Sequence, residues 1–117
     1  MNIDRYTPEM MAAGAIELRE NLTWLAKLGI TPCPDSEPGC VYHPDNLAAF
    51  IIRRNGIGWT ADLVLNRVPP GMPDVVGTPE AVPLPSRDAA LAAGRLILTK
   101  ILAASYLEQV KPLRRLH

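Results

Sequence analysis

Two cysteines and a histidine are the one cluster of metal-binding residue types in this sequence. Cys33, Cys40 and His43 lie in a proline-rich stretch. Zinc prefers four nitrogen or sulfur ligands in a tetrahedral array, whereas this stretch offers three, at a spacing that matches no standard finger or ribbon. His117 or a carboxylate would have to complete such a site. A disulfide is a second alternative, but the sequence favours two free thiols that behave as small apolar groups. We therefore expect no metal and no cofactor.

Carboxylates and nucleophiles give little support for catalysis. Asp62 and Asp74 are the candidates for a pair of acids that work as general acid and base, but we expect both to be solvated surface groups. A nucleophile made by Cys40 and His43 would lack a third group to orient the histidine. The sequence contains no phosphate-binding loop, dinucleotide fingerprint or nucleophile elbow. It therefore predicts a protein that is not an enzyme.

Arginines supply the candidate binding residues. Three of them are expected on a β-hairpin and just after it: Arg53, Arg54 and Arg67. Arg87 and Trp59 are their possible neighbours. Such charges can protect the edge of a sheet from aggregation, or they can form a patch for nucleic acid or an acidic partner. The whole chain is neutral, with three basic and seven acidic residues in 1–46 and nine basic and five acidic residues in 47–117. A protein that depends on phosphate contacts usually has a basic excess, so nucleic acid is the less favoured partner.

These side chains must be positioned by two helices and the strands between them. Residues 8–28 are expected to form a helix that Thr7 caps, that Pro8 begins and that Gly29 ends. Its apolar residues form one stripe at helical spacing: Met11, Ala15, Leu18, Leu22 and Leu25. Residues 31–46 are expected to form a loop, because their prolines interrupt regular structure.

Residues 47–83 predict a β-meander. Phe50 and Ile52 share one face of the first strand, and the next run alternates apolar and polar residues, with Thr60 and Asp62 pointing away from the apolar face. This period of two is typical of a sheet with one buried face. Asn55 and Gly56 suit a turn of two or four residues, while the prolines after position 78 place the third strand at a sheet edge.

The second helix is expected at residues 86–109, where Ser86 provides the cap, and a tail follows at 112–117, beyond the helix end before Pro112. Gly94 lies in the middle of this helix, so we expect a strand or an aromatic ring to approach it closely. The helix is apolar around most of its circumference, which one sheet face cannot cover, so either the helix at 8–28 or a second subunit must cover the rest. We therefore expect a homodimer, with Leu98 or Leu102 in or near the interface.

The chain of 117 residues thus predicts a single α+β domain, with an N-terminal helix, a three-stranded antiparallel β-meander and a long C-terminal helix packed on one sheet face. This element order is similar to that of the double-stranded RNA-binding domain, and the run from Ser86 to Ala90 loosely resembles the start of that family's final helix. The resemblance implies contacts between that helix start and phosphates. Arg87 is the basic residue there, beside Asp88.

The function that we expect is a small, non-catalytic regulatory protein that binds another protein. Its small size and lack of catalytic motifs also suggest a gene carried by a phage or another mobile element. A nucleic-acid-binding module is the alternative, and a small enzyme is third. Apolar stretches fall short of the ~20 residues that a membrane span needs, and the first residues show no signal-peptide pattern, so we expect a cytoplasmic protein.

Overall fold

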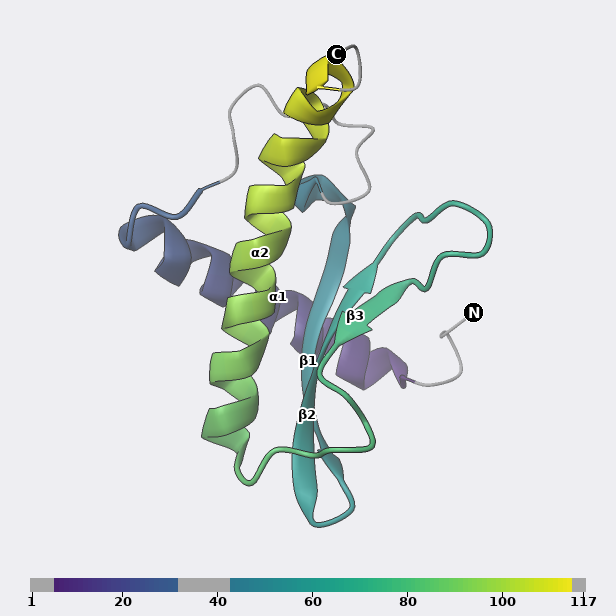
Figure 1. The fold of residues 1–117 in the computed structure, drawn as a ribbon. Helices are drawn as coiled ribbons and strands as arrows, with labels where there is room; N and C mark the ends of the chain where they lie inside the picture. Colours follow the sequence, from purple (N-terminus) through teal and green to yellow (C-terminus); the bar gives the residue numbers. More distant parts are fainter. Residues whose placement is uncertain (1–5, 32–42, 115–117) are drawn as a thin grey trace.

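The computed structural model describes residues 6–31 and 43–114, with side chains as far as residue 103. It confirms the predicted α+β architecture. The elements follow one another as helix α1 (Pro8–Lys27), a short 3-10 helix η1 (Pro44–Asn46), strands β1 (Leu47–Asn55), β2 (Gly58–Leu65) and β3 (Val75–Gly77), and helix α2 (Arg87–Arg114). The sheet is antiparallel with the order β1-β2-β3. Helix α2 lies along one face of the sheet, and α1 crosses behind it (Figure 1).

The hairpin between β1 and β2 closes with a two-residue turn. Asn55 pairs with Gly58, and Gly56 between them has a φ of 64°, which a non-glycine residue rarely adopts. At the other end of the hairpin the register shifts between Leu47 and Ala49, so that Ala48 is an extra, unpaired residue. Such a bulge bends a strand and changes the direction of its side chains.

Strand β3 is short and lies at the sheet edge, as the prolines predict. It pairs with β2 over three residues, and an isolated bridge joins Trp59 to Leu84 further along. The predicted β-meander extended to residue 83, but β3 ends at Gly77, because the prolines at 79 and 83 lack the N–H groups that a continuous ladder needs.

Helix α2 packs on the sheet face that carries Phe50, Ala61 and Leu63. At Gly94 the helix approaches the Phe50 ring closely, as the position of this glycine predicted. A Cβ there would overlap Phe50 and come within 3.0 Å of the Ala61 Cβ. The Ser86 hydroxyl caps the helix by accepting a hydrogen bond from the Ala89 N–H at 3.0 Å. The helix continues through Pro112 to Arg114, so the predicted end before Pro112 is wrong. The proline lacks the N–H that would bond the carbonyl four residues back, but only two helical residues follow it, so the interruption affects no more than the last turn.

Helix α1 has the predicted caps. The Thr7 hydroxyl accepts a hydrogen bond from the Met10 N–H at 3.1 Å. At the other end Gly29 has a φ of 83°, and the Ile30 N–H donates to the Leu25 carbonyl at 3.0 Å. Gly14 lies directly against β1, where a Cβ would come within 2.9 Å of the Ala49 Cβ. The first half of α1 therefore reaches the sheet face opposite α2, and its later leucines join the core beneath α2.

Two expectations about burial are wrong. The sheet is buried on both faces, since Thr60 and Asp62 are 0% and 3% exposed although they point away from α2. Leu98 and Leu102 are 0% and 2% exposed within a single chain, because Leu18 and Leu25 of α1 share their core cluster. These two leucines therefore expose almost no surface of their own to a second subunit, and the homodimer itself stays a prediction. None of the described helices is long and apolar enough to cross a membrane.

Candidate functional site

The candidate site is a cavity of about 640 Å³ between the start of α1 and the end of the sheet away from the β1–β2 turn. Most of its lining is apolar, and a few polar side chains lie among the apolar ones. The lining consists of Tyr6, Pro8, Met11, Ala48, Val64, Leu65, Asn66, Arg67, Val68 and Asp74. Its volume falls within the range of roughly 300–1,000 Å³ that is typical of ligand pockets.

Four segments build the cavity wall. The start of α1 and the residues just before it supply Met11 and Tyr6, while the bulge in β1 supplies Ala48. The end of β2 supplies Val64 and its neighbour, and the fourth segment is the connection between β2 and β3, which begins at Asn66. A regular register would have paired Ala48 with β2, whereas the bulge leaves it unpaired and changes the direction of its side chain, which lines this space.

A buried asparagine holds the connection in place. Asn46, 2% exposed, donates from its side-chain nitrogen to the Arg67 carbonyl at 2.8 Å and accepts from the Arg67 N–H at 3.0 Å. The Asn66 N–H donates to the Asn46 carbonyl at 2.8 Å, and the Leu65 N–H donates to the Asp74 carbonyl at 2.8 Å. The cavity wall is therefore fixed by hydrogen bonds rather than left as a free loop.

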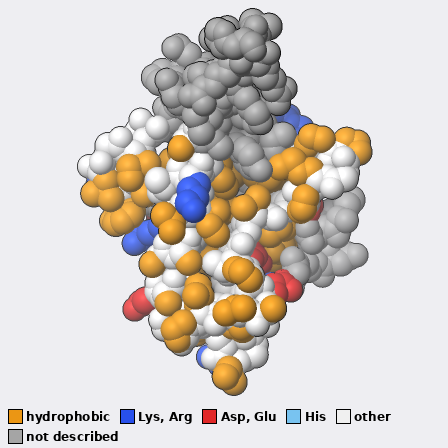
Figure 2. Space-filling view, viewed as in Figure 1, with side chains coloured by type: hydrophobic (Ala, Val, Ile, Leu, Met, Phe, Trp, Pro, Cys, Tyr) orange, Lys and Arg blue, Asp and Glu red, His pale blue; other side chains and the backbone are white. Residues whose placement is uncertain are grey.

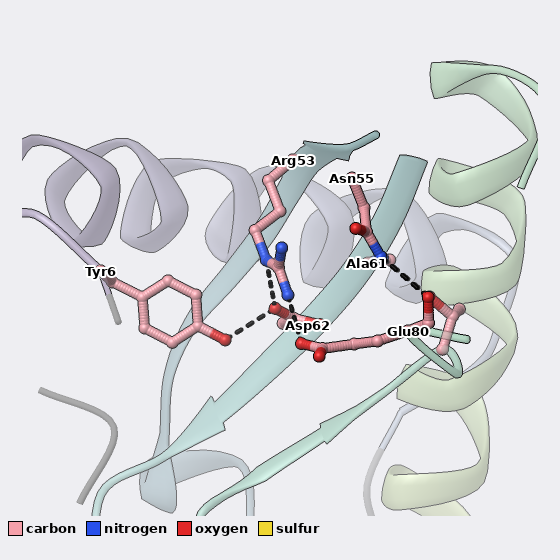
Figure 3. A network of polar contacts seen from close by, with 7 residues as sticks. Tyr6, Arg53, Asn55, Ala61, Asp62 and Glu80 are labelled. Atoms are coloured by element: carbon pink, nitrogen blue, oxygen red, sulfur yellow. Dashed lines mark hydrogen bonds and ion pairs between the residues drawn. The ribbon is translucent and has the colours of Figure 1, made fainter. Parts of the chain in front are cut away.

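A polar network around the buried Asp62 carboxylate adjoins the cavity through Tyr6. Figure 3 shows its residues. Both the Tyr6 hydroxyl and the Arg53 Nε donate to Oδ2 of Asp62, at 2.6 and 3.0 Å. A second nitrogen of Arg53 donates to Glu80 at 2.6 Å, and the Asn55 side chain donates to the Glu80 carbonyl at 2.9 Å. Tyr6 belongs to both the cavity wall and the network, so Asp62 fixes the position of one wall residue.

The network compensates the charges that it buries. Burial disfavours the charge of Arg53, but its hydrogen bonds and charge interactions with Asp62 and Glu80 outweigh this and raise its pKa above the ordinary value. The Asp62 carboxylate keeps two donors and an opposite charge in place of water, as a buried carboxylate requires. The prediction of Asp62 as a solvated surface acid is therefore wrong.

The arginines predicted as a binding patch do not gather in one place. Arg53 is held in the polar network around Asp62, while the guanidinium of the neighbouring Arg54 lies over the Trp59 ring, 5.2 Å from its centre. Arg67 lines the cavity beyond the opposite end of the hairpin, and Arg87 at the start of α2 comes within 3.9 Å of a Glu17 oxygen. Figure 2 shows hydrophobic side chains across the α2 face with charged groups scattered between them.

The predicted metal-type cluster is only partly described. Cys33 and Cys40 lie outside the described residues. His43 caps η1 by accepting a hydrogen bond from the Asp45 N–H at 3.1 Å. Within the described part of the chain, no three histidine, cysteine or acidic side chains come together as metal ligands would.

Sequence reasoning missed the cavity and its polar supports. Asn46 ends a proline-rich segment and Tyr6 precedes a helix, and neither position carries a recognisable motif. Comparison with known proteins gives no match, either to a family model, to a curated protein or to a solved structure.

Proposed function

We propose that this protein is a non-catalytic binding protein and that its cavity receives an apolar segment of a protein partner. The observation that carries the proposal is the cavity itself, which is large, mainly apolar and framed by a helix and a sheet. Burial of apolar surface is the main driving force for such binding.

The polar supports favour a preformed site. The Asn46 hydrogen bonds fix the β2–β3 connection, and the Asp62 hydrogen bond fixes Tyr6. A binding surface that is already ordered loses less conformational entropy when a partner binds. The proposed role of Asn46 and Asp62 is therefore to hold the walls of the cavity apart and in place.

Nucleic-acid binding is the weaker candidate, because the predicted arginines point to separate parts of the fold and Arg53 is neutralised by Asp62 and Glu80. Electrostatic binding to phosphates needs several cations along one surface.

A titration with N-phenyl-1-naphthylamine, a neutral apolar dye that fluoresces in apolar surroundings, tests the proposal. The dye should bind the parent protein, and Ala48→Phe should weaken binding at least tenfold because the ring occupies the cavity. Ala92→Phe on the exposed surface of α2 is the matched control and should bind like the parent. Equal binding by Ala48→Phe and the parent, or no binding by the parent, would contradict the proposal.

A further inference from the structure

We infer that the occupant of the cavity carries an acidic group beside its apolar part, and that Arg67 is the residue that selects for this group. The inference rests on the proposed function, since it concerns the same cavity. In a partner protein, the acidic group would be an aspartate, a glutamate or a terminal carboxylate next to apolar side chains.

Arg67 has a fixed backbone, and its side chain has no partner among the described residues. Its N–H and its carbonyl are both bonded to the Asn46 side chain, at 3.0 and 2.8 Å. Its own side chain is exposed at the cavity and makes no hydrogen bond or ion pair with any residue in the described ranges 6–31 and 43–103. The Arg67 guanidinium is thus a positive charge that is held at an apolar cavity and lacks a partner in these ranges. Such a group is suited to bind an anion through charge-assisted hydrogen bonds.

The other arginines of the sheet and of the described part of α2 have partners. Arg53 binds two carboxylates, and Arg54 lies over Trp59. Arg95 donates to Asn21 at 2.6 Å and lies 3.9 Å from the Trp24 ring centre. Arg67 therefore differs from them in being available to a ligand.

Two other features of the cavity act on an anion in opposite directions. The first turn of α1 borders the cavity through Pro8 and Met11, and the N-terminal end of a helix favours negative charge. Asp74 also lines the cavity, and its negative charge would oppose an acidic ligand. The inference therefore predicts that Asp74→Asn strengthens anion binding, while Arg67→Gln weakens it.

A pair of dyes that differ in charge tests this inference. 8-Anilinonaphthalene-1-sulfonate has the same aromatic body as N-phenyl-1-naphthylamine but adds a negative sulfonate. Arg67→Gln should raise the Kd of the sulfonate dye about tenfold, as expected for one charge-assisted contact, and should leave the Kd of the neutral dye unchanged. Arg19→Gln, which changes an exposed arginine of α1 outside the cavity lining, is the matched control.

The outcomes separate this inference from the proposed function. Binding of the neutral dye, together with an unchanged Kd of the sulfonate dye in Arg67→Gln, would overturn the inference and leave the proposed function standing. Absence of binding by the neutral dye would overturn both. Circular dichroism and thermal melts ensure that only variants folded like the parent are compared, because the sulfonate dye also binds partly unfolded proteins.

Discussion

Gly94→Ala gives the sharpest test of the packing between α2 and the sheet. The new Cβ would lie 2.5 Å from Phe50 Cε1 and closer still to Cζ, whereas carbon atoms in contact prefer about 3.5–4.0 Å. To relieve this overlap, the new methyl group and the Phe50 ring would have to move apart by about 1 Å. Phe50 is 0% exposed and enclosed by the core, which opposes such a movement. Overpacking of this kind typically costs ~1–3 kcal/mol.

Helix propensity acts in the opposite direction. Replacing glycine with alanine inside a helix stabilises it by ~1 kcal/mol where nothing obstructs the methyl group. Because the obstruction is severe, we expect Gly94→Ala to lower the free energy of unfolding by about 1–2 kcal/mol in urea denaturation. Ala92→Gly, at an exposed position in the same helix, measures the propensity term alone and should cost ~1 kcal/mol.

A double-mutant cycle shows whether Phe50 is the cause. Phe50→Leu removes the ring atoms that the new methyl group would overlap, so it should be less costly in the Gly94→Ala background than in the parent, with a coupling of at least ~0.5 kcal/mol. The reasoning is refuted if Gly94→Ala is as stable as the parent or more stable, or if the two changes are additive.

Three further predictions concern the buried polar groups and self-association. Tyr6→Phe removes one donor to the Asp62 carboxylate and should lower the free energy of unfolding by ~1.5–3 kcal/mol in urea denaturation; an unchanged value would show that the bond contributes nothing. Thr60→Val should be neutral or stabilising, because its buried hydroxyl has no hydrogen-bond partner among the described residues. Thr78→Val, in contrast, removes the acceptor of the Ala61 N–H and should cost ~1 kcal/mol; equal effects in thermal melts would contradict this assignment. The homodimer remains a prediction, now through apolar residues still exposed on the helices, and light scattering that gives the 12.8 kDa monomer mass at high micromolar concentration would exclude it.

Much of the fold could be predicted because local rules determine it. The alternation of apolar residues places Phe50 and Leu63 on one sheet face, and the observed register pairs them. Thr7 and Ser86 cap the two helices as their positions predict. Gly94 was informative because glycine is unfavourable inside a helix unless something requires it.

The errors arose where a second layer covers a surface. Asp62 lies on the polar side of an alternating strand, which normally indicates solvent. Tyr6 covers it from a distant part of the chain, and Arg53 covers it from the neighbouring strand of the same hairpin. Leu98 and Leu102 were expected in or near a dimer interface. The apolar stripe of α1 shows which of its residues are buried, but it does not show that α1 packs beside these two leucines. Periodicity reports which side chains share a face, and it does not report what covers that face.

The candidate site was missed for a similar reason. The five predicted binding residues were chosen by charge and sequence proximity, but Arg53 and Arg54 point to opposite faces of β1 because neighbouring residues in a strand alternate. Arg67 was identified as a binding residue, and the structure places it at the cavity. The cavity itself depends on the Asn46 bridge to the β2–β3 connection, which joins residues 21 positions apart.

Chemical-shift mapping by NMR tests the central claim most directly. Addition of N-phenyl-1-naphthylamine to the ¹⁵N-labelled protein should shift the amide signals of Met11, Ala48, Val64 and Val68, all of which line the cavity. The signals of Ala92 and Leu96 on the exposed surface of α2 should stay in place. Shifts confined to α2, or no shifts at saturating dye, would contradict the assignment of the cavity as the binding site.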